Sequence, residues 1–348
     1  MSLVNPDANM RLPVFISRLL PFLFCIILLL SAFIASTIGV VPVSWGEVWQ
    51  ILILKIMGKT AIPIPDNLIL AITELRLPRI VMSLLAGGGL AVCGALFQSI
   101  FRNPLCDPYM LGVSSGASLG AALAFVMGWH LLWVGVALPA LATALLTLLL
   151  VLGVSRIGYR RDSTRVLLTG IALNFLISAI ITLLIVANQQ EMSKIIFWTM
   201  GSFASVNWHD IGFLLPVVVL AIGVLFYHAK ELDIMQMGTD IAQTLGVNTG
   251  RCMLLTLLFA SLLIATIVSI CGVIGFIGLI IPHMVRLYFG NHNKDLFLYS
   301  FFFGAFFMLT ADTIARTLAL PSELPVGSIT ALAGTPYFLY LLLKRRCS

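Results

Sequence analysis

Charged residues are scarce in this sequence. Asp, Glu, Lys and Arg together make up 10% of the 348 residues, whereas hydrophobic residues make up 60% and the mean hydropathy is +1.08. Soluble domains are about half apolar and about one quarter charged, so the composition excludes a soluble globular protein. Each crossing of a bilayer takes about 20 apolar residues. We therefore expect an all-α, polytopic membrane protein with about ten transmembrane helices, folded as a single domain over residues 1–348.

The sequence also lacks the motifs of nucleotide-binding and metal-dependent proteins. It contains no G-x-x-x-x-G-K-[ST] phosphate loop, no dinucleotide-binding fingerprint and no H-E-x-x-H. Its six cysteines show no C-x-x-C spacing and its five histidines are scattered, which indicates neither a disulfide framework nor a metal site. We expect no catalytic residue, no metal and no cofactor bound by this chain.

The formal net charge of +6 does not indicate nucleic-acid binding, because the basic residues lie singly between apolar runs and form no stripe. When the chain is threaded through ten spans, most of its 20 Lys and Arg residues fall on the side of the N-terminus. Cytoplasmic loops carry an excess of Lys and Arg, so we expect a multi-pass protein of the bacterial inner membrane with both termini in the cytoplasm. The exceptions on the opposite side are Lys55, Lys59, Arg76, Arg79, Lys194 and Arg316.

Ten apolar runs mark the expected spans, each bounded by charge, Pro, Gly or a polar cluster. The first run is long and lacks a small-residue cleavage site, so it predicts a transmembrane helix and not a signal peptide. The runs are 19–41, 79–101, 109–127, 131–153, 166–187, 209–228, 252–272, 274–290, 296–316 and 326–343.

Small residues recur at helical spacing in the third run, where Gly112, Gly116 and Gly120 lie four residues apart. Such a face lets two helices approach closely in a membrane, and tight packing is the interpretation we favour. The alternative is a groove that also lines a pore. Near the end of the ninth run, Asp312 and Arg316 lie four residues apart and are expected to pair, which disfavours a proton relay.

Residues 230–250 form the longest informative hydrophilic segment on the expected cytoplasmic side. Met237, Ile241 and Leu245 recur every four residues, Thr239 or Asp240 can cap a helix, and Gly246 can end it. The pattern predicts a short amphipathic helix that needs a surface to bury against. We favour a protein partner over the membrane surface, because the helix carries few basic residues to attract anionic lipid.

Five segments, taken together, resemble the FecCD-like permease subunits of ATP-binding-cassette importers for iron chelates, haem and vitamin B12. They are ELRLPRIVMSLLAGGGLAVCGALFQSIFRNPLCDPYMLGVSSGASLG (74–120), FWTMGSFASVNW (197–208), GTDIAQTLGV (238–247), GVIGFIGLIIPHMVRL (272–287) and ADTIARTLALPSELPVGSITALAGTPYFLYLLLKRR (311–346).

The resemblance implies the architecture of a type II ABC importer permease, a transport subunit that is not itself an enzyme. It implies a second permease subunit as homodimer or paired paralogue, two cytoplasmic ATP-binding subunits that use ATP and Mg, and a soluble substrate-binding protein. The surrounding membrane lipid is the remaining partner, and no nucleic acid is expected.

Three groups of site residues follow from the resemblance. Arg76, Arg79 and Arg316 would bind acidic residues of the binding protein, although arginines at helix ends also act as membrane anchors. Asn103 and Leu105, with Ser163 and Thr164, would form the gate of the translocation path. The alternatives there are a simple turn at Asn103 and a helix cap at Ser163 or Thr164. The residues of the ATPase-coupling helix would be Gly238, Ile241, Ala242, Leu245 and Gly246.

The substrate cannot be read from residue types, because a large chelate in a broad cavity makes few specific demands. An iron-siderophore or haem is the first hypothesis, with cobalamin or an oxyanion on the same architecture as the alternative. An ion-coupled secondary transporter is the competing mechanism. A polytopic membrane enzyme would need His, Asp or Glu clustered at membrane depth, and the sequence pattern shows none.

Overall fold

The computed structural model describes residues 14–39, 43–57, 64–131, 135–155, 163–320 and 322–346, and every regular element in these ranges is helical. The elements are α1 (Val14–Thr37), α2 (Trp45–Met57), α3 (Asp66–Leu70), η2 (Ala71–Arg76), α4 (Leu77–Ile100), η3 (Pro108–Leu111), α5 (Val113–Val126), η4 (Trp129–Leu131), α6 (Ala137–Ser155), α7 (Ser163–Ala187), α8 (Met192–Thr199), α9 (Trp208–Tyr227), α10 (Ala229–Met237), α11 (Thr239–Thr244), α12 (Thr249–Cys271), α13 (Ile277–Phe289), α14 (Asn293–Ala315) and α15 (Val326–Arg346).

The helices correspond in order to the ten predicted apolar runs. Within the described residues, seven helical stretches are long and apolar enough to cross a membrane, and the shorter α5 and α13 are also apolar. Helix α15 completes the set at the C-terminal end of the chain. The all-α, polytopic prediction is therefore confirmed. The short helices α2, α3 and α8, and the π-helical turn η2, were not expected from the hydropathy pattern.

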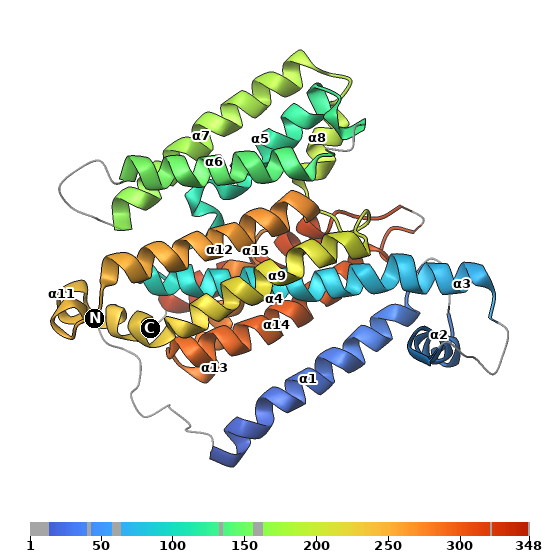
Figure 1. The fold of residues 1–348 in the computed structure, drawn as a ribbon, viewed down its shortest axis with the longest axis horizontal. Coiled ribbons are helices and arrows are strands. Elements are labelled where there is room, and N and C mark those ends of the chain that lie inside the picture. Colours follow the sequence, from blue (N-terminus) through green and yellow to red (C-terminus); the bar gives the residue numbers. More distant parts are fainter. Residues whose placement is uncertain are drawn as a thin grey trace.

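Helix α4 lies at the centre of the bundle, with α12 and α9 on one side and α14 on the other (Figure 1). Every residue from Ala86 to Ser99 is buried, which requires close neighbours on all sides of the helix. A Cβ atom on Gly87 would overlap the backbone carbonyl of Gly304 in α14, and one on Gly94 would overlap Gly278 in α13. Glycine is thus required where α4 meets the backbones of two neighbouring helices.

A second group of helices, α5, α6 and α7, packs together along one side of α12 (Figure 1). In α5, a Cβ atom on Gly116 would lie 2.9 Å from the Thr143 carbonyl oxygen of α6, and one on Gly120 would overlap Pro139. The tight-packing interpretation is confirmed at these two glycines. Gly112 has a different role, because its φ of +78° forms the left-handed turn between η3 and α5.

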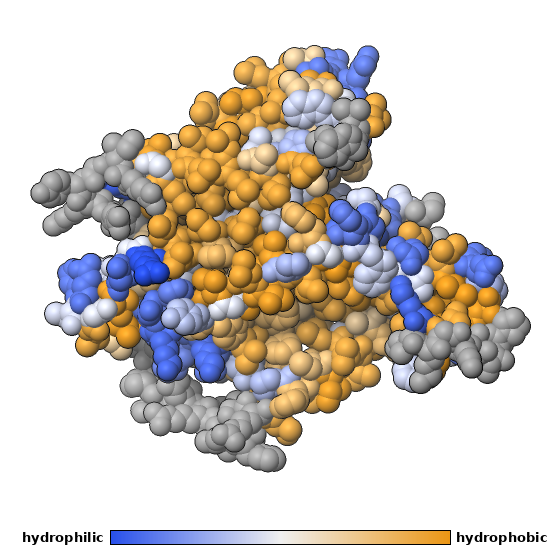
Figure 2. Space-filling view, viewed as in Figure 1, coloured by the Kyte–Doolittle hydropathy of each residue, from blue (hydrophilic) through white to orange (hydrophobic). Residues whose placement is uncertain are grey.

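The outer surface matches a protein surrounded by lipid. Figure 2 shows apolar side chains across the middle of the molecule, with hydrophilic ones gathered toward its ends. Large apolar side chains such as Phe22, Phe175 and Leu183 are more than two-thirds exposed, at 70%, 75% and 69%. A soluble protein rarely exposes contiguous apolar patches of this kind, so the band is the surface that contacts acyl chains.

We predict that Gly120→Ala destabilises the protein by about 1–3 kcal/mol, because the added methyl group must push α6 away from α5. The thermal midpoint of the purified protein in detergent measures the effect. Gly223→Ala in α9 is the matched control, since nothing lies within 4 Å of the added Cβ atom. An equal loss of stability in both variants would contradict the packing role of Gly120.

Candidate functional sites at the two ends of the bundle

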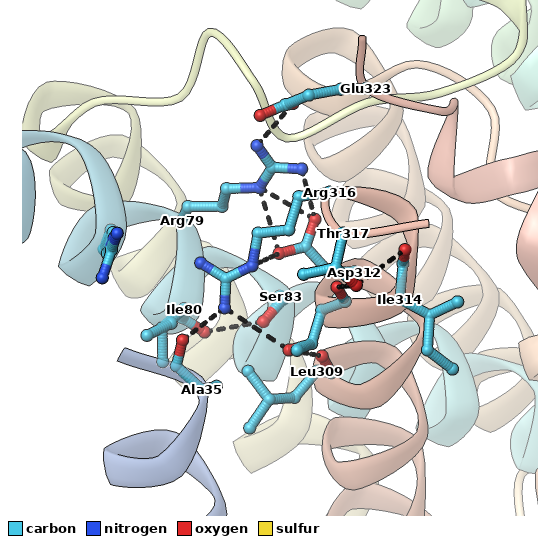
Figure 3. Close-up of polar contacts among 12 residues, drawn as sticks. Ala35, Arg79, Ile80, Ser83, Leu309, Asp312, Ile314, Arg316, Thr317 and Glu323 are labelled. Carbon is cyan, nitrogen blue, oxygen red and sulfur yellow. Dashed lines mark hydrogen bonds and ion pairs between the residues drawn. The ribbon is translucent and has the colours of Figure 1, made fainter. Parts of the chain in front are cut away.

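A cluster of buried charges lies at the end of the bundle that carries α2, α3 and η2 (Figures 1 and 3). Arg79 of α4 donates from Nε to both carboxylate oxygens of Asp312 in α14, at 2.9 and 3.0 Å. Its Nη1 also donates to Oε2 of Glu323 at 2.7 Å. Two carboxylates therefore hold one guanidinium group, and the contact joins residues more than 230 positions apart in the chain.

Two further arginines complete this outer cluster, which we define as Arg76, Arg79, Asp312, Arg316 and Glu323. Arg316 donates from Nη2 to the Ala35 carbonyl at 2.6 Å, and its Nε lies 4.0 Å from Asp312. Arg76 donates from Nη1 to the Ser36 carbonyl at 2.7 Å. Both arginines thus bind the last turn of α1, whose terminal carbonyls lack partners within the helix.

The predicted pairing of Asp312 with Arg316 is present but is not the main contact of Asp312, which is with Arg79. The docking role expected for Arg76, Arg79 and Arg316 requires guanidinium groups that a partner can reach. In the structure all three residues are buried, at 8%, 7% and 4% exposure, and each has a partner within the chain. The burial argues against docking through freely exposed arginines in this conformation.

The opposite end of the bundle carries α10 and α11 (Figure 1). Gly238, with a φ of +140°, separates the two helices, and Gly246, with a φ of +84°, follows α11. The N-cap position of α11 is occupied by Gly238, which has no side chain to form a cap hydrogen bond. The prediction that Thr239 or Asp240 caps this helix is therefore wrong. The short helix expected in this segment is present, six residues long.

The apolar row expected on this helix is exposed to solvent. Met237, Ile241 and Leu245 are 70%, 49% and 63% exposed, whereas Ala242 is completely buried. The backbone N–H of Val247 donates to the Ala242 carbonyl at 2.9 Å, so the chain that follows α11 is bonded back to the last turn of this helix. A surface with three large apolar side chains outside the membrane-spanning helices indicates a docking site for another protein.

Polar contacts fix α10 to the main bundle. Asn293, at the start of α14, donates from its backbone N and from Nδ2 to Oδ1 of Asp233 in α10, at 2.8 Å each. The side chain of Asn293 also contacts the Ser99 hydroxyl at 2.6 Å, and Arg286 of α13 donates to that hydroxyl at 2.7 Å. One network therefore joins α10 to α4, α13 and α14.

The loop after α4 contains two of the predicted gate residues and lies at the same end of the bundle. Arg102, which has an unusual φ of +49°, donates from Nη2 to the Met235 carbonyl of α10 at 2.6 Å. Asn103 and Leu105 are exposed, and the Asn103 side chain accepts from the backbone N–H of Leu105 at 3.0 Å. Asn103 therefore lies in a turn that presents both residues to solvent, and their gate role stays a prediction.

The far side of this loop is anchored in the core. The Asp107 carboxylate accepts from the Tyr109 backbone N–H at 2.8 Å and caps η3, while the Tyr109 hydroxyl donates to the Ile274 carbonyl at 2.9 Å. Burial raises the pKa of Asp107 to about 6, against the opposing effect of the Tyr109 hydrogen bond. The exposed residues Asn103 and Leu105 therefore project from a loop that is held firmly on its far side.

The other predicted gate residues, Ser163 and Thr164, form the first turn of α7, which begins at Ser163. Their side chains lie outside the described part of the structure, so their gate role stays a prediction. Sequence reasoning missed Glu323 and Arg102, which the structure places in the outer cluster and beside α10. Each has a partner distant in the chain, and no local spacing in the sequence points to it.

The helical bundle, with its buried charge cluster at one end and the exposed apolar face of α11 at the other, is that of a polytopic membrane transport subunit. Residues 26–344 match the FecCD transport family. The chain belongs to this family, whose members are permeases of ABC importers for iron chelates, haem and vitamin B12.

Named relatives extend over most of the chain. The cobalamin import system permease protein BtuC of Halobacterium salinarum is 38% identical over 309 residues, which cover 89% of this chain and 83% of the relative. The hemin transport system permease protein HmuU of Yersinia pestis is 34% identical, covering 78% and 83% of the two chains. The Fe(3+) dicitrate permease protein FecC of Escherichia coli is 32% identical, covering 92% and 94%.

A solved structure of a metal-chelate type ABC transporter in an inward-facing conformation is also similar. It is 32% identical in sequence, with a TM-score of 0.82, and the match covers 93% of this chain and 99% of that chain. The similarity includes almost the whole bundle, so the family assignment applies to the fold as well as to the sequence.

We predict that Asp312→Asn lowers the free energy of unfolding by about 3–5 kcal/mol, because it leaves Arg79 and Arg316 buried around a neutral side chain. Thermal unfolding in detergent measures the loss. Lys194→Gln is the control, since its ion pair with Glu191 is about half exposed on the Lys194 side and contributes about 1 kcal/mol or less. Similar midpoints for the two variants would show that the Asp312 contacts do not stabilise the fold.

Proposed function

We propose that the chain imports a metal chelate, with an iron-siderophore or haem as the first candidate, across the inner membrane into the cytoplasm. The substrate is delivered by a soluble binding protein, and transport is driven by two separate ATPase subunits that use ATP and Mg. The single observation that carries this proposal is the exposed apolar row on Met237, Ile241 and Leu245, in a chain of the FecCD transport family.

The coupling segment, residues 230–250, is the proposed contact with the ATPase. Ile241 and Leu245 present the apolar surface, Ala242 fixes α11 against the protein, and Gly238 and Gly246 form the turns on either side of it. A partner that covers this row would remove the three large apolar side chains from water. The hydrophobic effect then favours binding at this place.

A second permease subunit completes the translocation path in this proposal, either as an identical copy or as a paired paralogue. Asn103 and Leu105, with Ser163 and Thr164, form the gate at the cytoplasmic end of the path. The exposure of Asn103 and Leu105 supports this arrangement, because a gate residue needs a surface that can meet its counterpart. We place both termini in the cytoplasm, in line with the excess of basic residues on that side.

Docking of the binding protein is proposed at the outer cluster. Glu323 is the exposed member, with its side chain 35% exposed, and it occupies Nη1 of Arg79. A carboxylate of the binding protein can reach Arg79 only by displacing Glu323. Docking through Arg76, Arg79 and Arg316 therefore becomes an exchange of one carboxylate for another.

Cobalamin is the second candidate substrate, because a relative named as a cobalamin import permease is 38% identical over 89% of this chain. Relatives named for hemin and for Fe(3+) dicitrate support the first candidate. All three compounds are bulky metal chelates, so uptake of each by one reconstituted transporter decides between them. Ion-coupled transport is the competing mechanism, and it predicts uptake that continues without an ATPase.

We predict that Leu245→Asp abolishes ATP-dependent uptake and leaves the permease folded. The side chain is exposed, so the fold tolerates the charge, but an ATPase surface would have to bury it. The measurement is uptake of hemin, a ferric siderophore and cobalamin into proteoliposomes containing the permease, its ATPase and the loaded binding protein.

Gln243→Glu is the matched control, because it adds a negative charge to the exposed side of α11 away from the apolar row. It should retain uptake. Normal uptake by Leu245→Asp would remove α11 from the coupling role. Uptake that depends on an ion gradient and not on ATP would overturn the proposed function itself.

We predict that Glu323→Gln strengthens binding of the binding protein about fivefold at low salt, since Arg79 then lacks one of its two charged partners. The gain should disappear at high salt, where exposed charge pairs are screened. Binding is measured on nanodiscs that contain the permease. Glu191→Gln, which disrupts the exposed pair with Lys194, is the control. Unchanged affinity in Glu323→Gln would exclude Arg79 from docking.

A further inference from the structure

Three side chains with metal-binding atoms meet at the end of the bundle that carries α11. They are His228, at the junction of α9 and α10, Glu231 in the first turn of α10, and Cys252 in the first turn of α12. The imidazole nitrogen, carboxylate oxygen and thiol sulfur all lie within 4.8 Å of one another. The His228 Nδ1 atom is 2.6 Å from Oε2 of Glu231. We call these residues the α10–α12 cluster.

The fold holds this cluster in place from both sides. Helix α12 packs against α9 and α10, which brings Cys252 to the two residues that precede it by more than 20 positions. His228 and Cys252 are buried, at 9% and 1% exposure, whereas the Glu231 side chain is 41% exposed. The cluster is thus enclosed on the protein side and open to water at the carboxylate.

The geometry points to a binding site for a divalent transition metal of the zinc class, with His228, Glu231 and Cys252 as its three protein ligands. Imidazole nitrogen, carboxylate oxygen and thiolate sulfur are the donors that Zn²⁺ accepts, and a site with three protein ligands keeps a fourth position for water. Mg²⁺ and Ca²⁺ prefer oxygen ligands alone, so the buried sulfur selects against them.

The side chains need only small movements to bind the ion. Zinc–ligand distances of about 2.0–2.3 Å place tetrahedral ligand atoms about 3.3–3.8 Å apart, and the three atoms are already within 4.8 Å. The metal enters from the exposed carboxylate and takes the place of the proton shared by His228 Nδ1 and Glu231 Oε2, which leaves to the solvent or moves to Nε2 of the imidazole. Binding converts the Cys252 thiol to a thiolate and releases its proton to the solvent.

The metal would also link the two helices that flank the coupling helix. Glu231 precedes α11 and Cys252 follows it, so the bound ion closes a loop that contains α11. A loop closed in this way has less freedom to move relative to the bundle. On the proposed function, on which this step rests, an occupied site slows transport by restraining the segment that responds to the ATPase.

The binding step is tested with Co²⁺ as a spectroscopic substitute for Zn²⁺, on reduced, full-length permease without a polyhistidine tag. We expect one Co²⁺ per chain, a thiolate-to-cobalt charge-transfer band, d–d bands of four-coordinate intensity, and loss of these signals when Zn²⁺ is added. Zn²⁺ should also raise the thermal midpoint, because it binds the folded state.

Matched variants assign the signals to the α10–α12 cluster. Cys252→Ser should remove the charge-transfer band, whereas Cys271→Ser, at the other end of α12, and Cys25→Ser should retain it. Glu231→Gln should weaken Co²⁺ binding at least about tenfold and abolish the Zn²⁺-dependent rise in thermal midpoint. Because Glu231 is partly exposed, this variant tests the site even if Cys252→Ser does not fold. A band that persists in Cys252→Ser, or its absence from the parent protein, overturns the site.

The effect on transport is measured separately, by adding Zn²⁺ on the cytoplasmic side of proteoliposomes that contain the full transporter. Uptake by the parent should fall several-fold, and uptake by Glu231→Gln should not respond. Cobalt spectra without any inhibition would overturn the regulatory step while supporting the site. Failure of ATP-dependent uptake in the absence of Zn²⁺ would instead count against the proposed function, and the spectra would still decide the metal site.

Discussion

Close backbone contact around α4 is the constraint on which the rest of the structure depends. Lipid is as apolar as the side chains it touches, so burial from water does not hold these helices together within the membrane. Dispersion between closely packed atoms, together with hydrogen bonds between helices, does so, and dispersion decays steeply with separation. The contacts of Gly87 with Gly304 and of Gly94 with Gly278 bring α4 directly against the backbones of α14 and α13. Apolar composition determines which segments cross the membrane, whereas small residues allow the resulting helices to pack closely together.

Polar contacts then distinguish the two ends of this assembly. At the outer cluster, the carboxylates of Asp312 and Glu323 balance the guanidinium groups of Arg79 and Arg316, and Arg76 binds the end of α1. Each arginine of the cluster has a partner within the chain, and Glu323 is the most exposed member of the cluster. At the other end, α11 presents apolar side chains that no described part of this chain covers. The two ends therefore differ in what a partner would meet, paired charges at one and uncovered apolar side chains at the other.

The sequence predicts the spans well because membrane crossing imposes a length and an apolar composition on each one. It also predicts the row on Ile241 and Leu245, since helical spacing is a local property. It does not predict that Arg79 is buried, because its partner Asp312 is 233 residues away. The same limit applies to Arg102, whose acceptor is the Met235 carbonyl of α10. The local sequence pattern indicates where helices form and which of their faces are apolar. Which charged side chains contact one another is seen only in the folded bundle.

At the end of the bundle that carries α11, helix α10 takes part in most of the polar contacts described above. Its Met235 carbonyl accepts from Arg102 of the loop after α4, and its Asp233 binds the start of α14. Glu231 of α10 and the preceding His228 lie beside Cys252 of α12. Contacts alone do not establish coupling, which requires an element with two arrangements. Helix α11, flanked by glycines of positive φ, has an exposed side-chain hydrogen bond to α12, from Gln243 Nε2 to Thr249 Oγ1 at 3.3 Å. Helix α11 therefore connects to the bundle on both sides, to α10 through Gly238 and to α12 through Gln243 and Thr249. Because α10 accepts a hydrogen bond from Arg102, the α10 side of this connection leads directly to the loop that contains Asn103 and Leu105.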